Sequence, residues 1–421
     1  MPTINVNSVI AMAAILLFSQ AAIAAAITSA TLPQAEVTSA PTAAYDDSFL
    51  PLMAWDDVEN TATIKKMADC GINVIAFVPP DLLPACEKYH VKAIVFDPRV
   101  TPNWDKPFDS KRANKVLPDI IAKCNASPAV YGYHLKDEPG GDQFPELAKS
   151  AALVQKLAPG KWPYINLPPG MGKWYDTSYI QSFVDQCKPP ILSYDNYAIG
   201  EKVDFSYGFW ANIWDMRSAA LRNNLPFHVI VLTSAHFNYR VPNDADLRLE
   251  VYGSLVYGAR GIGYYKFRSR PLAVLGAPDL GNFRGGPLDD FDEKTVTWQY
   301  LRNLNRKITN LAPYLLKLHS DDVYHVGTIP EENHGITSST LVSSLDSGKE
   351  LIIGDFTSTS DGSRWVMVVN KDLHESTFCR PKFSIPAKNP QYVSPVSGKL
   401  TPFSGQWYAL APGQGVLIKL N

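Results

Sequence analysis

The sequence predicts a (β/α)8 barrel followed by a small antiparallel β-sandwich. Eight short apolar runs alternate with amphipathic stretches between residues 50 and 310. The runs are apolar on both faces, as the strands of a buried parallel sheet are. After about residue 318 the helical patterns stop, and short alternating runs separated by turn residues begin. With 421 residues, the chain is long enough for a large barrel and a smaller partner domain.

The elements of the predicted barrel follow one another in strict strand–helix order. Between the strands, apolar residues recur at spacings of three and four, and many of these stretches end on Gly or Asn, as amphipathic helices do. The helix after the second strand, around 81–90, is short, and the last one covers 295–318. The expected strands are 51–55, 73–78, 92–97, 129–138, 162–167, 190–197, 227–234 and 261–267. We therefore expect the barrel to span 49–317 and the sandwich 318–421.

The N-terminus has the pattern of an export signal. Residues 1–24 contain an apolar run that ends in small residues, and Ala22-Ile23-Ala24 fits an A-x-A cleavage site. Residues 25–48 contain few bulky apolar side chains, which predicts a flexible linker. We therefore expect an exported protein, periplasmic or extracellular, with no membrane anchor after cleavage of the signal.

Composition narrows the class of partner. The 39 basic and 41 acidic residues nearly balance and form no basic run, so a nucleic-acid partner is not expected. The five cysteines have no zinc-binding spacing, and no glycine-rich phosphate loop or serine elbow is present. We expect no cofactor and no metal, although Asp56, Asp57 and Asp97 would suit Ca²⁺. The 9 Trp, 20 Tyr and 18 Phe favour a carbohydrate partner, because flat rings stack on sugar faces.

Polar and aromatic side chains gather where the predicted strands end, which is where barrel enzymes place their active sites. Two carboxyl groups within a ring of aromatic residues are typical of glycoside hydrolases. One carboxyl protonates the leaving oxygen, and the other attacks the anomeric carbon or activates a water molecule. The candidates are Trp55, Asp56, Asp57, Asp97, Asp137, Glu138, Asn166, Tyr194, Asp195, Tyr197, His236, Tyr265 and Lys266.

Structural roles are open for several of these residues. Asp56 and Asp57 are also placed to cap the first helix, and Asp97, which precedes a proline, is placed to brace a loop. His236 and Lys266 are as well suited to structural hydrogen bonds or ion pairs as to substrate binding.

The stretch "GYHLKDEP" at 132–139 resembles the fourth-strand motif of the clan A glycoside hydrolases, in which Asn-Glu-Pro carries the acid/base Glu. Glu138 and Pro139 match this motif, and Asp137 stands at the Asn position. The stretch "LRLEVYGSLVYGARGIGYYKF" and the tail segments "WVMVVNKD", "SPVSGK" and "LAPGQGVLIKL" resemble bacterial family 42 β-galactosidase-like proteins. The resemblance implies a barrel glycosidase with Glu138 as its acid/base.

One position departs from that family pattern. Clan A enzymes carry a nucleophilic Glu at the end of strand seven, where this chain has "VIVLTSAHFNYR" and no carboxylate before Asp244. The best remaining partner for Glu138 is Asp195 in "SYDNY". Asp56 or Asp57 is a fallback, and Asp137 is able to take the second role itself.

The working hypothesis is a secreted glycoside hydrolase. Glu138 is the general acid or acid/base, and Asp195 is the nucleophile or base. Asp137 tunes Glu138 or binds a sugar hydroxyl. Substrate-binding roles fall to Trp55, Asp56, Asn166, Tyr194, Tyr197, His236, Tyr265 and Lys266.

Two alternatives remain at this point. The first is a barrel that binds glycans without catalysis, and the second is a polysaccharide lyase-type barrel with Tyr194 or His236 as its base. The sequence carries no signal for the oligomeric state.

Overall fold

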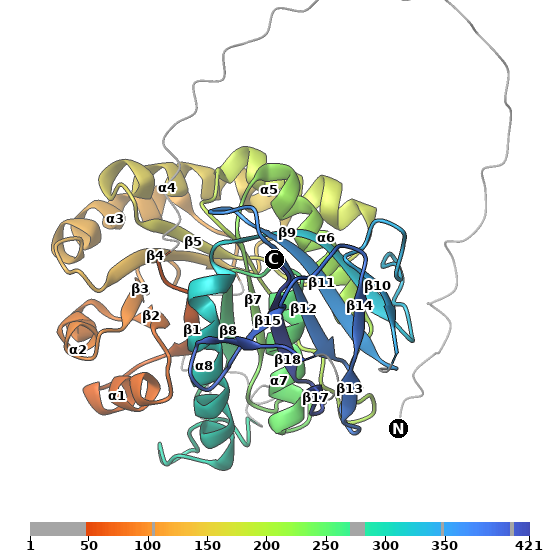
Figure 1. Cartoon of the computed structure of the whole chain (residues 1–421). Coiled ribbons are helices and arrows are strands. Elements are labelled where there is room, and N and C mark those ends of the chain that lie inside the picture. The colour runs from red at the N-terminus through yellow and green to blue at the C-terminus, as the bar shows by residue number, and fades with distance from the viewer. Residues whose placement is uncertain (1–47, 103–105, 270–282, 347–348, 405–407) are drawn as a thin grey trace, which may run out of the picture. The chain divides into compact units, whose positions relative to one another are not determined.

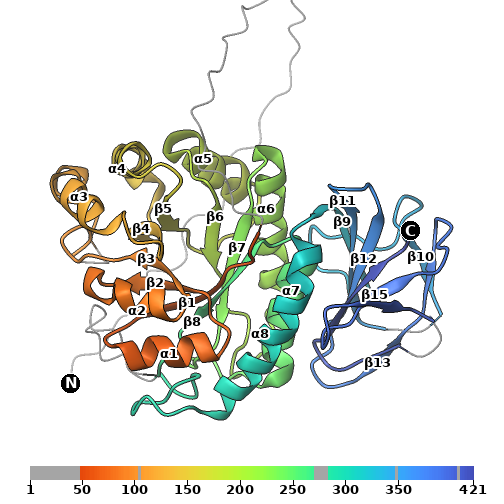
Figure 2. The same ribbon diagram turned by 60° about the vertical axis from the view of Figure 1, so that its left-hand side comes forward.

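The computed structural model describes residues 48–102, 106–269, 283–346, 349–404 and 408–421. In these ranges the first part of the chain is a barrel of eight parallel strands with helices around its outside (Figures 1 and 2). The strands are β1 (Leu52–Asp57), β2 (Val74–Val78), β3 (Lys92–Val95), β4 (Val130–Asp137), β5 (Trp162–Asn166), β6 (Leu192–Asp195), β7 (Phe227–Leu232) and β8 (Gly261–Tyr265). The predicted fold class is confirmed.

The strands pair in the order β5-β4-β3-β2-β1-β8-β7-β6, and β1 pairs with β8. The ring closes between β5 and β6 through a parallel bridge from Leu167 to Tyr194, where the Leu167 amide donates to the Ser193 carbonyl at 2.8 Å. The carboxyl ends of all eight strands therefore meet at one mouth.

Helices fill the connections as expected, with local differences. The helices are α1 (Thr61–Asp69), α2 (Leu83–Lys88), α3 (Ser110–Cys124), α4 (Phe144–Leu157), α5 (Gln181–Cys187), α6 (Gly208–Asn223), α7 (Asp244–Val256) and α8 (Val296–Leu315). The short second helix is confirmed. A π-helical segment, Trp174–Ile180, directly precedes α5.

Side-chain caps mark where several of these helices begin. Asn60 accepts from the Thr63 amide at 2.9 Å, and Asn243 and Asp246 form a reciprocal capping box at the start of α7. Such caps satisfy amides that have no partner inside the helix. None of the helices in the described ranges is long and apolar enough to span a membrane.

The barrel has two apolar layers. Inside it, Met53, Trp55, Ile94, Trp162 and Tyr164 pack together, and a larger layer lies between the strands and the surrounding helices. Alternation along each strand separates the two layers, because successive side chains of a strand point to opposite faces.

The C-terminal part is antiparallel. Its strands are β9 (Leu318–Val326), β10 (Val342–Leu345), β11 (Leu351–Ser358), β12 (Arg364–Asn370), β13 (Thr377–Cys379), β14 (Pro381–Phe383), β15 (Gln391–Val393), β16 (Leu400–Pro402), β17 (Tyr408–Leu410) and β18 (Gly415–Lys419). Six form one sheet in the order β16-β15-β18-β12-β11-β9, and β10 with β14 and β13 with β17 form two small sheets.

Both faces of the six-stranded sheet are buried. Ile352 and Met367 on one face belong to the same apolar layer as the barrel helices, whereas Ile353 and Val368 on the other face belong to a separate core. Gly354 permits the close approach to the barrel, since a Cβ there would lie 2.5 Å from the Val256 carbonyl oxygen at the end of α7.

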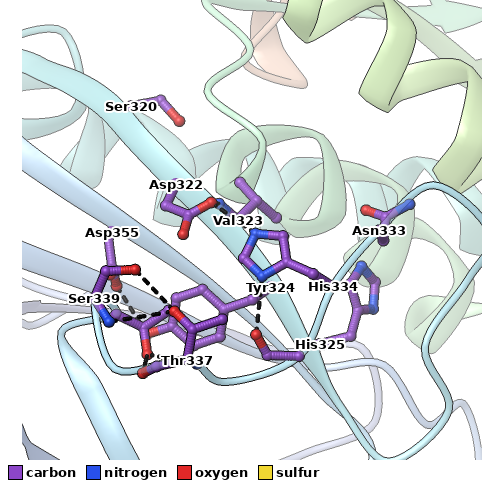
Figure 3. A network of polar contacts seen from close by, with 12 residues as sticks. Ser320, Asp322, Val323, Tyr324, His325, Asn333, His334, Thr337, Ser339 and Asp355 are labelled. Carbon is purple, nitrogen blue, oxygen red and sulfur yellow. Dashed lines mark hydrogen bonds and ion pairs between the residues drawn. The ribbon is translucent and has the colours of Figure 1, made fainter.

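A polar network holds the segment between β9 and β10 (Figure 3). The Tyr324 hydroxyl donates to Asp355 at 2.9 Å, and Asp355 also accepts from the Leu341 amide at 2.7 Å. His334 lies 2.9 Å from Asp322. Because these partners sit on β9 and β11 and on the segment itself, the network fixes that segment to the sheet.

Candidate active site

Strand register brings three polar residues together at the mouth of the barrel. Asp137 on β4 is paired with Asn166 on β5. Asp195 on β6 follows Tyr194, which bridges to Leu167 directly after Asn166. The ends of β4, β5 and β6 therefore bring Asp137, Asn166 and Asp195 side by side.

The Asn166 amide connects the two aspartates. Its Nδ2 donates to Asp137 Oδ1 at 3.1 Å and to Asp195 Oδ1 at 2.7 Å. Ser193 Oγ donates to Asn166 Oδ1 at 2.9 Å, and Tyr164 OH lies 2.7 Å from Ser193 Oγ. These contacts hold the amide so that its N–H groups face the carboxylates. We expected Asn166 to bind substrate, but it is fully buried and its donors are used, so it is a positioning residue.

The same contacts fix the spacing of the two aspartates. Both Oδ1 atoms bind one nitrogen, and the acceptors of an amide NH₂ lie about 5 Å apart when each hydrogen points at one oxygen. The Asn166 amide therefore holds Asp137 and Asp195 at a fixed separation.

Glu138 follows Asp137 in a strained conformation. Its φ is +44°, in the left-handed region that non-glycine residues usually avoid at a cost of about 1–2 kcal/mol. Its amide donates to the Asn166 carbonyl at 2.9 Å, which anchors the turn. The side chain is exposed to solvent and hydrogen-bonds to that of Asp195. Glu138 is thus the member of the group that a substrate in the mouth reaches first.

Burial raises the pKa of all three carboxyl groups, and neighbouring charges add to the rise for Asp137 and Asp195. Burial raises the pKa of Asp137 to about 7, and the neighbouring Glu138 charge adds to this effect. Burial, followed by the charges of Glu138 and Asp137, raises the pKa of Asp195 well above its ordinary value. Burial also raises the pKa of Glu138, while the hydrogen bond from Asp195 opposes the rise. At neutral pH the proton of the Glu138–Asp195 pair therefore resides on Asp195, the more buried member.

A second charged cluster joins β1 to the segment after β8. The Arg268 amide donates to Asp56 Oδ2 at 2.7 Å, its guanidinium pairs with Asp57, and Lys266 Nζ lies 3.8 Å from Asp56 Oδ1. Asp56 and Lys266 were expected to bind substrate, but both are fully buried. Their contacts join β1 to the segment after β8. Asp97 pairs with Arg99 at 2.7 Å, so the proposed Ca²⁺ set is not assembled.

Three expected aromatic residues meet next to the carboxylates. Tyr197 and Tyr265 stack with ring centroids 5.3 Å apart, and His236 meets both edge-on, at 5.5 and 5.2 Å. His236 Nδ1 lies 3.1 Å from the Ser234 carbonyl, and burial lowers the pKa of His236 to about 4. This ring cluster is uncharged at neutral pH and forms one wall of the site.

Two expected residues lie away from the mouth. Trp55 is 2% exposed and packs inside the barrel against Phe77 and Tyr164. Tyr194 is fully buried and belongs to the layer between strands and helices. The two-residue period of β6 points Asp195 inward and Tyr194 outward.

The end of β7 holds no carboxylate on its barrel side. Thr233 and Ser234 follow the strand, and both are fully buried. Glu250 on α7 approaches from the helix side, where it accepts from the Leu232 amide at 3.4 Å. Burial raises the pKa of Glu250 well above its ordinary value, so it is a neutral brace behind the strand.

Sequence reasoning missed several residues that complete the site. Phe283 stacks on His236 at 5.0 Å, and Tyr239 meets Tyr197 edge-on at 5.6 Å. Tyr179 donates to the Pro139 carbonyl at 2.5 Å, directly after Glu138. The sequence feature that indicates such residues is an aromatic residue within a polar connection, as in "AHFNYR", and not a position at the end of a strand.

No family model and no curated protein matches the chain. Solved structures do match. A β-galactosidase from the psychrophilic Marinomonas ef1 has a TM-score of 0.50 at 11% identity, covering 64% of this chain and 62% of its own. A glycoside hydrolase family 5 protein from Bacteroides vulgatus ATCC 8482 has a TM-score of 0.54 at 13% identity, covering 88% of both chains. A protein named only as a glycoside hydrolase reaches 0.54 at 13% identity, covering 89% and 93%.

The chain has the fold of the barrel glycoside hydrolases. The barrel of this chain therefore resembles barrels of known structure. The alignment with the family 5 protein also includes most of the C-terminal part. The chain spans less than two thirds of the Marinomonas enzyme. None of the three names gives family 42, so that closer resemblance stays an expectation.

Proposed function

We propose that the protein is an exported glycoside hydrolase whose catalytic centre is the Glu138–Asp195 pair. The observation that carries the proposal is the direct hydrogen bond between these carboxyls at the mouth of a barrel with this fold. Two carboxyls that share one proton hold what acid/base hydrolysis needs, a donor and an anion.

Glu138 and Asp195 differ in solvent exposure, and this difference distinguishes their roles. Glu138 is exposed, so it protonates the glycosidic oxygen, and Asp195 passes its proton along the hydrogen bond to Glu138. Asp195 is then an anion beside the anomeric carbon. Its charge stabilises the positive oxocarbenium-like transition state, either by attack on that carbon or by activating water.

Excess negative charge supports this assignment. Asp137, Glu138 and Asp195 disfavour one another's ionisation, and a positive transition state relieves that repulsion. The site therefore favours the transition state over the neutral substrate. Asp137 contributes by its charge and by holding the other side of the Asn166 amide.

The test is hydrolysis of a panel of neutral glycans and aryl glycosides, with release of reducing sugar as the readout. We expect the wild type to hydrolyse at least one member, and Glu138→Gln and Asp195→Asn each to lose at least 100-fold in rate. The exposed Asp119→Asn variant on α3 is the matched control and keeps wild-type activity.

Three results would contradict the proposal. Wild-type protein that binds a glycan without hydrolysing it indicates a binding barrel. Unsaturated products that absorb in the ultraviolet indicate a lyase. Near-wild-type turnover by either carboxylate variant removes that residue's role.

A further inference from the structure

Large exposed apolar side chains gather on one half of the mouth. The connections after β5, β6 and β7 expose six of them, and the described part of the connection after β8 exposes Phe291, whereas the described residues in the connections after β1 to β4 expose none. The six are Met171, Trp174, Val203, Tyr207, Phe237 and Val241. Exposed apolar side chains concentrated beside polar groups mark a binding surface.

These three connections contact one another. The Glu201 amide donates to the Asn238 carbonyl at 2.9 Å, which joins the β6 connection to the β7 connection. A Cβ at Gly208 would lie 3.6 Å from Met171 Cε, which places the β5 connection beside the start of α6. The six side chains therefore belong to adjoining loops.

A first aromatic path leads from Glu138 to solvent. Tyr179 donates to the Pro139 carbonyl, and the Glu138 charge contributes to the raised pKa of Tyr179, after burial. The Trp174 ring lies 5.7 Å from the Tyr179 ring at an interplanar angle of 35°. Trp174 is 68% exposed, so a large part of its indole surface is accessible to solvent.

A second path leads from Asp195. Tyr197 follows Asp195 by two residues in the chain, and its ring contacts that of His236. The Phe237 ring lies 5.4 Å from His236 and is 48% exposed. Phe237 also has a φ of +45°, a backbone conformation that costs energy for an aromatic residue. In this conformation the ring is partly exposed to solvent.

We infer that Trp174 and Phe237 are two separate stacking platforms for an extended chain of neutral sugars, which the protein cleaves internally. The inference rests on the proposed function for the cleavage and on the two aromatic paths for the binding. The first path begins at Pro139, next to Glu138, and the second at Tyr197, two residues after Asp195, so we expect sugar units on both sides of the cleaved bond to meet an aromatic surface. Glu138 and the ionised fraction of Asp137 carry negative charge, which disfavours acidic glycans.

Affinity electrophoresis of the full chain tests the binding. The gels contain mixed-linkage β-glucan, xylan, galactomannan or polygalacturonate. We expect at least one neutral glycan to retard the wild type, and Trp174→Ala and Phe237→Ala each to weaken binding at least fivefold. Phe378→Ala, which removes an equally exposed ring in the C-terminal part, is the matched control and binds as the wild type does.

The outcomes separate this inference from the proposed function. Retardation of Glu138→Gln equal to that of the wild type shows binding independently of hydrolysis. Retardation only by polygalacturonate, no retardation by any neutral glycan, or unchanged binding by both platform variants overturns the inference. On the glycan that binds, viscosity should fall faster than reducing ends accumulate. Loss of single terminal sugars without a drop in viscosity overturns internal cleavage.

Discussion

Glu138 and Asp195 are hydrogen-bonded to each other across the mouth of the barrel, from the ends of β4 and β6. Two carboxyls form such a bond only when one of them is protonated. The more buried Asp195 holds the proton, and the exposed Glu138 accepts the bond. This shared proton is the basis of the mechanism proposed above.

Replacing Asp137 by Asn should stabilise the protein at high pH. The folded pKa of Asp137 is about 7, above its ordinary value of 3.8, so the folded state resists losing a proton that the unfolded state releases. Stability of the wild type is therefore lost progressively as pH rises from about 4 to about 7. Asn keeps the Oδ1 acceptor for Asn166 and removes the charge.

The measurement is the free energy of unfolding by urea at several pH values. We expect Asp137→Asn to exceed the wild type by on the order of 1 kcal/mol or more at pH 8, and to equal it near pH 4. A difference that does not change with pH would contradict the raised pKa.

Replacing Asn166 by Ala should damage catalysis through the position of the aspartates. The variant loses both amide donors, and kcat should fall roughly 100-fold, as for a displacement of about 1 Å in an active site. The lost hydrogen bonds lower the pKa of Asp137 and Asp195 in the wild type, so the alkaline limb of the pH–rate profile, where Asp195 loses its proton, should move to higher pH.

Ser193→Ala is the graded control for Asn166. It removes only the donor to Asn166 Oδ1 and leaves both amide N–H groups, so the loss should be smaller. If Asn166→Ala lowers the amount of folded protein while kcat and the alkaline limb stay unchanged, Asn166 has no positioning role.

Glycine should be the most stable small residue at position 138. Gly adopts a φ of +44° without the strain that a Cβ causes, so Glu138→Gly should be more stable than Glu138→Ala by about 1 kcal/mol. At Glu146 in the first turn of α4 the order should reverse, because Gly in a helix costs about 1 kcal/mol relative to Ala. Equal stability of the two variants at 138, measured by urea unfolding, would show that the backbone there is unstrained.

The architecture follows from local patterns. Eight apolar runs buried on both faces and the helical stretches between them specify a barrel, and the end of β4 then places Glu138 at the mouth. The pairing of Glu138 with Asp195 follows the same rule, because the ends of β4 and β6 face one opening.

Side-chain direction within the site was harder to predict. The two-residue period makes every strand residue point in or out according to register. Irregularities between Ala54 and Asp57 in β1 and between His134 and Lys136 in β4 shift that register. Composition alone therefore does not predict that Trp55 packs inside the barrel or that Asn166 is buried between the two aspartates. The exposure of Trp174 and Phe237 depends on loop contacts between segments far apart in the chain.

The pH dependence of kcat/KM, measured for the wild type and Glu138→Gln on the glycan that the panel identifies, tests the central claim most directly. The account predicts a bell-shaped profile for the wild type, because the active pair carries one proton, and a loss of at least 100-fold at the optimum in Glu138→Gln. A wild-type rate that does not change between pH 4 and 9, or a Glu138→Gln rate near that of the wild type, would contradict the claim that the Glu138–Asp195 pair performs the reaction.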